Sequence, residues 1–376
     1  MVAVDAMFLA TVQANPHLRP RVGNPDEMRS NRMIQTLENL KFRVTDPELG
    51  IPEDTHGSVI TALNEEAVAS AALGNKGGIN FIHTYEAFGA KMYGVVRQEI
   101  IFTDHCNEVG RRQGWLSIPL VLTSHTWENA KNERSHQDPS MAEAMLGEPS
   151  DVSRVLFVPD YNTASVVTHH LYQTRGQIWT LVVPKTEMIP DLFTFEEAST
   201  LLQQGALRLD WASRDLDQQR VILTAIGAYQ LEEVLKASGR LRERNVSHSI
   251  IYMQEPGRFR IPRSRREMTH VISAQLQAEL YPSSVPARIF VTHARPEVLL
   301  GILQPLHTGI YQTSGLGFIN HGGTLSVQGM LFVNRCSWGH ILLEVARVLG
   351  ILQEELLTSE ELAALSGKAS PEGVLF

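Results

Sequence analysis

Residues 115–139 read WLSIPLVLTSHTWENAKNERSHQDP, an apolar run followed at once by a polar segment. The run 115–122 has the length and the continuous apolar character of a strand buried in a parallel sheet. The polar segment holds His125, Lys131, Asn132, His136 and Asp138. Because open α/β sheets bind ligands at the carboxyl ends of their strands, we predict a functional site in this segment.

The same segment carries a family resemblance, together with three other stretches in a fixed order. Residues 24–32 read NPDEMRSNR, residues 85–88 read YEAF, and residues 159–163 read PDYNT. With TSHTW and SHQDP, they resemble the phosphoketolases, which are thiamine diphosphate enzymes that split ketose phosphates, and more distantly the transketolases. The family patterns are G-P-D-E-T-x-S-N-R for the first stretch and Y-E-A-F for the second.

The resemblance covers only the second half of a phosphoketolase. The first half of such an enzyme carries a Gly-Asp-Gly…Asn segment that holds Mg²⁺ and the cofactor's diphosphate, and this sequence contains no Gly-Asp-Gly. The resemblance therefore implies a pyrimidine-binding domain followed by a C-terminal domain. It also implies a partner chain that supplies the diphosphate-binding domain and most of the Mg²⁺ ligands, in a heterotetramer or a larger complex.

The composition is that of a globular protein of 376 residues, long enough for two domains. Hydrophobic residues make up 43% and charged residues 20%, and the formal net charge of −8 argues against nucleic-acid binding. We interpret the arginine-rich run 258–266 as a solvated loop. Two distant cysteines, an N-terminus without a basic leader and the lack of a long apolar run predict a cytoplasmic protein with no membrane span.

Alternating helix-like and strand-like segments predict an α/β fold with two domains, each a mostly parallel sheet flanked by helices. In the first domain we expect strands at 78–83, 154–159 and 178–183 and helices at 58–73, 88–109, 163–175 and 194–207. We expect Thr194 and Glu197 to form a capping box at the start of the last helix. In the second domain we expect strands at 221–226, 249–253 and 288–291 and helices at 231–241 and 338–349. The polar stretch 214–219 places the boundary near residue 212, which gives domains 1–212 and 213–376.

Glu65 lies at the start of a predicted helix, where the thiamine enzymes keep a glutamate. In those enzymes the carboxyl bonds a ring nitrogen of the aminopyrimidine and promotes the imino tautomer that forms the ylid. The family usually has Glu-His here, whereas this chain has Glu65-Glu66, so the choice between the two carboxylates stays open. Acidic residues are also favoured in a first helical turn by the helix dipole alone.

Three aromatic residues are predicted to bind the cofactor. Tyr85 and Phe88 match the aromatics that line the pyrimidine pocket of the family, and Phe81 lies close to them in sequence. Flat aromatic faces suit a flat heteroaromatic ring, although aromatics at this spacing also suit a hydrophobic core.

The remaining predicted site residues concern the substrate. His136 matches the histidine of S-H-Q-D-P, and we predict it to be catalytic because imidazole, with a pKa near neutrality, moves protons readily. The resemblance implies substrate contacts for residues whose hydroxyl, amide and cationic groups suit a sugar phosphate, namely Ser30, His125, Lys131, Asn132 and Lys185.

Glu128 departs from the family, which usually has arginine at this position. A carboxylate beside a phosphate is repulsive unless it is turned away or paired with Arg134. If Glu128 faces the pocket, the donor or the acceptor should differ from an ordinary ketose phosphate. The sequence has no zinc-protease, P-loop, dinucleotide or serine-hydrolase motif, and we predict no metal site in this chain itself.

These observations predict a subunit of a split phosphoketolase- or transketolase-like enzyme that cleaves a ketose or its phosphate with thiamine diphosphate and Mg²⁺. The two-carbon unit would leave as an acyl phosphate or pass to an acceptor. Two alternatives stay open: a split ketol transferase with a non-sugar acceptor in a specialised biosynthetic pathway, and a non-catalytic scaffold or regulator. An adjacent gene for a chain with Gly-Asp-Gly…Asn would favour the enzymes over the scaffold.

Overall fold

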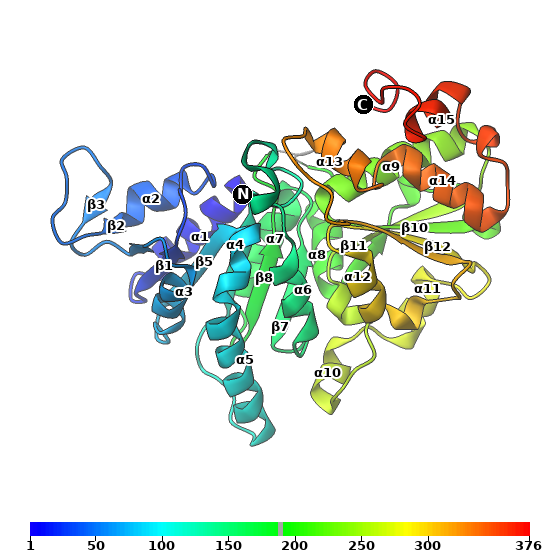
Figure 1. The fold of residues 1–376 in the computed structure, drawn as a ribbon. Coiled ribbons are helices and arrows are strands. Elements are labelled where there is room, and N and C mark those ends of the chain that lie inside the picture. Colours follow the sequence, from blue (N-terminus) through cyan, green and yellow to red (C-terminus); the bar gives the residue numbers. More distant parts are fainter. Residues whose placement is uncertain (187–190) are drawn as a thin grey trace. The chain divides into compact units, whose positions relative to one another are not determined.

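The computed structural model describes residues 1–186 and 191–376, apart from the side chains of Ala130 and Lys131. The chain forms two compact units (Figure 1). The first unit consists of Met1–Asn129, Ser135–Leu202 and Arg263–His270, and the second of Ala130–Arg134, Gln203–Pro262 and Val271–Phe376. The chain divides mainly between Leu202 and Gln203, and each unit also includes a short segment from the other side of this division. The domain boundary near residue 212 stays a prediction.

The first unit is built on an eight-stranded sheet in the order β3-β2-β4-β1-β5-β6-β8-β7. All neighbouring strands run parallel, as the sequence predicts. The strands are β1 (Pro20–Asn24), β2 (Phe42–Arg43), β3 (Glu53–Asp54), β4 (Val59–Thr61), β5 (Ile79–Tyr85), β6 (Ile118–Thr123), β7 (Ser153–Phe157) and β8 (Ile178–Val182).

Helices cover both faces of this sheet. On one face, Phe8 of the first helix contacts Phe81 of β5 and Tyr172, with ring centroids 4.8 and 6.1 Å apart. On the other face, Gly23 of β1 lets a helix backbone approach closely, because an added Cβ would lie 2.4 Å from the carbonyl oxygen of Val68. The helices are α1 (Val2–Ala14), α2 (Ile34–Leu40), α3 (Glu65–Leu73), α4 (Glu86–Gly89), α5 (Tyr93–Glu108), α6 (Ser140–Gly147), α7 (Tyr161–Leu171), α8 (Phe195–Gln204) and α10 (Arg265–His270).

The helix expected at 58–73 is wrong at its beginning. Residues 59–61 form β4, an assignment that suits the β-branched side chains of Val59, Ile60 and Thr61. The helix α3 begins only after Asn64, whose side-chain oxygen accepts a hydrogen bond from the amide of Ala67. The capping box expected from Thr194 and Glu197 is confirmed by reciprocal hydrogen bonds of 2.8 and 3.1 Å.

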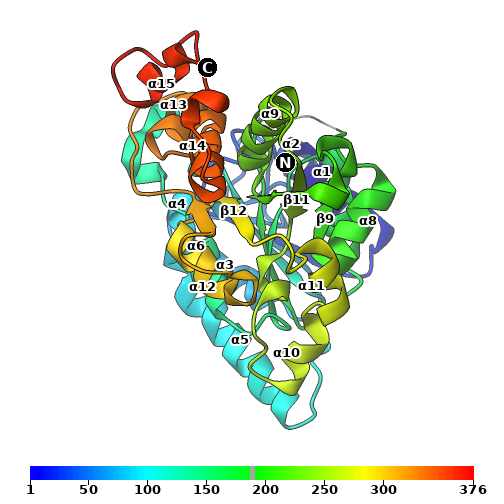
Figure 2. The same ribbon diagram turned by 90° about the vertical axis from the view of Figure 1, so that its right-hand side faces the viewer.

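The second unit contains a five-stranded sheet in the order β13-β12-β10-β11-β9, in which only β9 runs antiparallel to its neighbour. Figure 2 shows α9 and α14 on one side of β12 and α12 on the other. The strands are β9 (Ala206–Arg208), β10 (Val221–Ile226), β11 (His248–Met253), β12 (Ala287–Thr292) and β13 (Thr313–Leu316). The helices are α9 (Ala228–Glu243), α11 (Ala274–Leu280), α12 (Pro296–Ile302), α13 (Val327–Val333), α14 (Trp338–Leu349) and α15 (Ser359–Leu365).

The segment 263–270, which contains α10, belongs to the first unit although it follows β11 along the chain. Arg263 donates a hydrogen bond of 2.7 Å to the carbonyl oxygen of Glu148, and Arg266 pairs with Asp151 at 2.9 Å. Part of the arginine-rich run is thus bound to the first unit, whereas we expected a solvated loop. Within the described residues, no helix combines the length and the apolar character needed to span a membrane.

Candidate active site

Most of the predicted site lies at the carboxyl ends of β1, β5 and β6, which are neighbours in the first sheet. Asp26 comes shortly after β1, Tyr85 ends β5, and His125 comes shortly after β6. This edge is where open parallel sheets bind their ligands, because the loops that follow the strands leave a crevice there.

Asp26 and Ser30 hold the end of β5. The backbone amide of Tyr85 donates to Asp26 Oδ2 at 2.9 Å, and the Tyr85 hydroxyl donates to Ser30 Oγ at 3.3 Å. Burial raises the pKa of the Asp26 carboxyl above its ordinary value, and Glu65 adds to this, while the Tyr85 amide and Lys91 oppose it. Asp26 was not singled out from the sequence, although it lies within the family stretch 24–32.

Three rings meet beside this strand end. The ring centroids of Phe88 and His136 are 4.7 Å apart in an edge-on arrangement, and Tyr85 lies 6.1 Å from Phe88 and 6.0 Å from His136. The hydroxyl of Ser135 lies 2.8 Å from His136 Nδ1. The structure therefore brings together one predicted catalytic residue and two predicted cofactor-binding residues.

Glu65 reaches the same place from the first turn of α3. Its Oε1 accepts a 2.8 Å bond from Lys91 Nζ, and only 12% of its side chain is exposed. Lys91 Nζ also lies 4.5 Å from the ring centroid of Phe88. Glu66 is exposed and faces Gly94 of α5, so the geometry favours Glu65 as the carboxylate beside the aromatic rings.

Phe81 does not join these rings. It is fully buried in the hydrophobic core, against Phe8 of α1, so the structure gives it a packing role and does not bring it to the site. His83 lies on the same face of β5, because side chains two apart in a strand point the same way. Among the described residues neither of its ring nitrogens has a hydrogen-bond partner, and burial lowers its pKa to about 3. His83 is therefore neutral at physiological pH.

Glu128 is bound to the loop that follows β8. Its two carboxylate oxygens accept hydrogen bonds of 2.9 Å from the backbone amides of Lys185 and Thr186. The His125 Nδ1 atom lies 3.8 Å from Glu128 Oε2, and both side chains are 2% exposed. Glu128 therefore holds the loop after β8, which carries Lys185, a role that was not predicted from the sequence.

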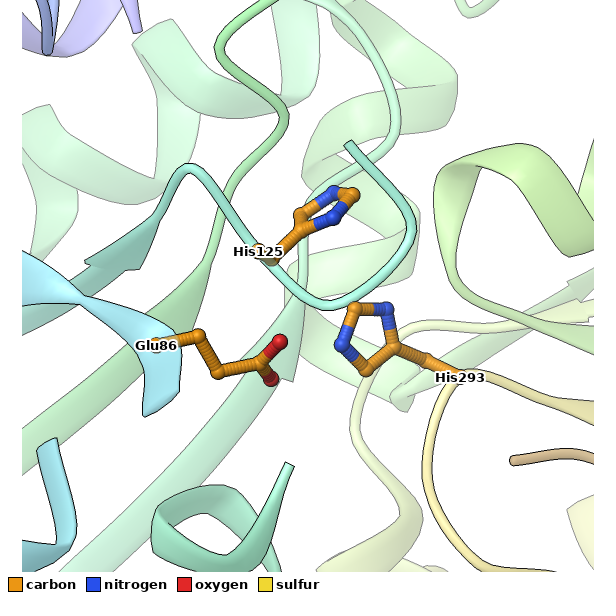
Figure 3. Close-up of side chains that lie close together, drawn as sticks. All are labelled: Glu86, His125 and His293. Carbon is orange, nitrogen blue, oxygen red and sulfur yellow. The ribbon is translucent and has the colours of Figure 1, made fainter. Parts of the chain in front are cut away.

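Glu86 supports the loop that carries His125. Figure 3 shows its side chain reaching from α4 toward that loop. The buried carboxylate accepts bonds of 2.7 and 2.8 Å from the backbone amide and the hydroxyl of Thr126. A carboxylate oxygen of Glu86 lies within 4.8 Å of a ring nitrogen of His125. His293, which Figure 3 also draws, belongs to the second unit.

The segment 130–134 is described with the second unit, where Arg134 Nε donates to the carbonyl oxygen of Gly322 at 3.4 Å and Thr324 donates to Glu133 at 3.2 Å. Asn132 is exposed in this segment, and the side chain of Lys131 lies outside the described residues. The structure thus gathers Ser30, Glu65, Tyr85, Phe88 and His136, and it links His125 with the loop of Lys185.

The carboxyl edge of the second sheet is of another kind. Gly227, Gln254 and His293 directly follow β10, β11 and β12, in register with one another. Gly227 has a φ of 119°, and an added Cβ would lie 2.3 Å from Gln230 Oε1. The side-chain amides of Gln230 and Gln254 are fully buried and have no hydrogen-bond partner within the part of the chain that the structure describes. No residue predicted for the site lies here.

The two units have the fold of transketolases. The structure is similar to a transketolase from Leishmania mexicana, with a TM-score of 0.68 and 15% identity, over 94% of this chain and 45% of that chain. It is also similar to a split gene transketolase described as an inactive beta4 tetramer, with a TM-score of 0.60 and 13% identity, over 93% of this chain and 97% of that chain. At this level of identity the likeness shows the fold alone.

Comparison of the sequence identifies the family more specifically than comparison of the fold. Residues 2–174 match the family model of D-xylulose 5-phosphate/D-fructose 6-phosphate phosphoketolase, and residues 187–364 match that of the XFP C-terminal domain. A probable phosphoketolase of Brucella abortus is 26% identical over 86% of this chain and 41% of its own length. One of Mesorhizobium japonicum is 31% identical over 59% of this chain and 28% of its own length. The chain belongs to the phosphoketolase family, and it spans less than half the length of these relatives.

Proposed function

We propose that this chain is the pyrimidine-binding and C-terminal subunit of a split thiamine diphosphate-dependent enzyme of phosphoketolase or transketolase type. One observation carries the proposal: the Glu65 carboxylate and the Phe88 ring lie close enough to share a single partner, the Lys91 ammonium. A carboxyl group beside an aromatic face suits a flat heterocycle that takes a hydrogen bond at a ring nitrogen. Membership of the phosphoketolase family supports this assignment.

The residues at the edge of the first sheet then have distinct roles. When bound, thiamine diphosphate supplies the carbanion that attacks a ketose carbonyl. Glu65 holds the proton at the pyrimidine nitrogen, and Tyr85 and Phe88 offer flat faces to the ring. His136, which lies against Phe88, moves a proton at a substrate oxygen.

A phosphorylated ketose is the donor that fits this edge. Lys185 and Ser30 provide a cation and a hydroxyl for phosphate oxygens. The Glu128 carboxylate is bound to the backbone amides of Lys185 and Thr186, so its charge is partly offset within the chain, and this weakens the case for a different donor or acceptor.

The diphosphate and Mg²⁺ are held by a partner chain. The sequence lacks the Gly-Asp-Gly segment that the resemblance assigns to this task, and the relatives are more than twice as long as the matched region. A chain of a split transketolase has the same fold over 97% of its length, which supports a division of the enzyme at this point.

Calorimetry with thiamine diphosphate and Mg²⁺ tests the proposal. The full chain alone should bind weakly, because most of the cofactor's charge is normally held through the metal. Addition of a partner with Gly-Asp-Gly…Asn should produce tight binding and ketose cleavage together. Sub-micromolar binding by this chain alone would overturn the split-subunit assignment, and an assembled complex that never turns over would favour the scaffold alternative.

A further inference from the structure

Lys91 contacts both groups that define the proposed pyrimidine pocket. Its Nζ lies 2.8 Å from Glu65 Oε1 and 4.5 Å from the ring centroid of Phe88. The Lys91 side chain is 59% exposed, whereas Glu65 is 12% exposed, so a flexible surface cation reaches in to a largely buried carboxylate. The pKa of the Asp26 carboxyl is raised by Glu65 and lowered by Lys91, so Lys91 also acts electrostatically on a second carboxyl group.

We infer that Lys91 competes with the cofactor's aminopyrimidine for Glu65 and Phe88, an inference that rests on the function proposed above. The ammonium occupies the same two groups that the heterocycle needs, namely the Glu65 oxygen, which as a carboxyl donates to the ring nitrogen, and an aromatic face. Both occupants cannot hold the Glu65 oxygen and the face of Phe88 at once. Lys91 is thus a specificity-determining residue that lowers the affinity of the pocket for weakly bound pyrimidines.

The chain offers a matched control at the other end of α3. Lys76 Nζ lies 2.5 Å from Glu99 and 4.8 Å from the ring centroid of Trp115. Its side chain is 42% exposed and that of Glu99 is 15% exposed, so the local environment is alike. Lys76→Met therefore removes the same kind of contact outside the proposed pocket.

A small probe isolates the pyrimidine contact from the missing diphosphate site. We would titrate 4-amino-5-hydroxymethyl-2-methylpyrimidine, uncharged at mildly alkaline pH, into the full chain and follow ligand-observed NMR signals. Lys91→Met should bind the probe about two- to fivefold more tightly than the wild type, as expected for loss of a half-exposed ion pair and cation–π contact. Lys76→Met should bind like the wild type, and Lys91→Arg should not gain affinity.

Salt separates competition from a structural effect. Between about 20 mM and about 1 M NaCl, the wild-type affinity should rise toward that of Lys91→Met, because screening weakens the ion pair while the probe is uncharged. A gain in Lys91→Met that persists unchanged at high salt would overturn the inference, and so would equal affinities at low salt.

Glu65→Ala distinguishes failure of this inference from failure of the proposed function. If Glu65→Ala weakens probe binding while Lys91→Met has no effect, the pocket is correctly placed and Lys91 is not a competitor. If the probe binds no variant, or binds Glu65→Ala as well as the wild type, the pyrimidine pocket itself is misassigned and the inference falls with it.

Discussion

The carboxyl edges of the two sheets differ in chemistry although both belong to parallel α/β units. At the first edge, Asp26 accepts a hydrogen bond from the Tyr85 amide and Glu65 accepts one from Lys91. The His136 ring packs edge-on against Phe88. At the second, Gln230 and Gln254 bury uncharged amides that have no partner among the described residues. The first edge gathers three titratable side chains around aromatic rings, whereas the second places His293 beside two buried amides that have no partner among the described residues.

This difference supports the proposal that the chemistry takes place at the edge of the first sheet. A strand's carboxyl end offers a place for ligands, but the reaction depends on titratable groups held near one another. In the first unit, α3 and the loop before α6 bring Glu65 and His136 to that place from separate parts of the chain.

The strongest test of the first edge is Glu65→Gln in the assembled complex. Turnover should fall by about 10²- to 10⁴-fold, because the role proposed for the carboxyl is an obligatory proton transfer. Assembly, followed by size-exclusion chromatography, should be unchanged, and Glu66→Gln should retain activity. An active Glu65→Gln beside an inactive Glu66→Gln would transfer the role to the neighbouring carboxylate.

His83 lies just behind the first edge and should make the stability of the first unit depend on pH. Its folded-state pKa of about 3 lies below the ordinary value of 6.5, so only the unfolded chain takes up its proton as pH falls through this range. Well below pH 6.5 and above about pH 3, the wild type should lose about 1.4 kcal/mol of stability per pH unit from this group. Urea unfolding of His83→Leu should show a flatter pH dependence, whereas parallel curves would mean that the imidazole is solvated.

Lys185 tests whether the first edge recognises phosphate. Lys185→Ala should raise KM for a phosphorylated ketose by about tenfold and leave the use of hydroxypyruvate nearly unchanged, because uniform binding energy appears in KM. Steady-state kinetics with both donors make the comparison. Equal losses would point to a structural role in the loop that Glu128 fixes, and a wild-type preference for hydroxypyruvate would reject a phosphorylated donor.

The smallest effect concerns the second edge. Gln254→Leu should increase the free energy of unfolding by about 1 kcal/mol, because it replaces an unpaired buried amide with an apolar side chain of similar size. Chemical denaturation measures this change, and turnover of the complex serves as the control and should not move. A destabilised variant would show that the amide is hydrogen-bonded through buried water, and the contrast between the edges would then be weaker.

Much of the fold could be predicted from sequence because the buried strands of a parallel sheet are continuous apolar runs. The parallel sheets and the capping box at Thr194 agree with the structure. The start of α3 could not be placed, since the apolar pattern continues from β4 into the helix and only the Asn64 cap separates them.

The site could be predicted in part, and its limits have a physical cause. Glu65, Tyr85, Phe88 and His136 are recognisable through short local motifs. Lys91 escaped notice because its partner Glu65 lies 26 positions earlier in the chain. The orientation of Glu128 stayed open because its partners are backbone amides, which a pattern of side chains does not reveal.

Two short segments are grouped with the other unit than their neighbours in sequence, and this affects how hybrids of this protein with a relative can be designed. Residues 130–134 are grouped with the second unit and residues 263–270 with the first. A chimera made with a relative by one crossover between Leu202 and Gln203 would inherit both segments from the wrong parent. Arg263 and Arg266 would then face a foreign version of the loop that holds Glu148 and Asp151. Exchange of one whole unit therefore takes three blocks, whereas a single crossover exchanges only one.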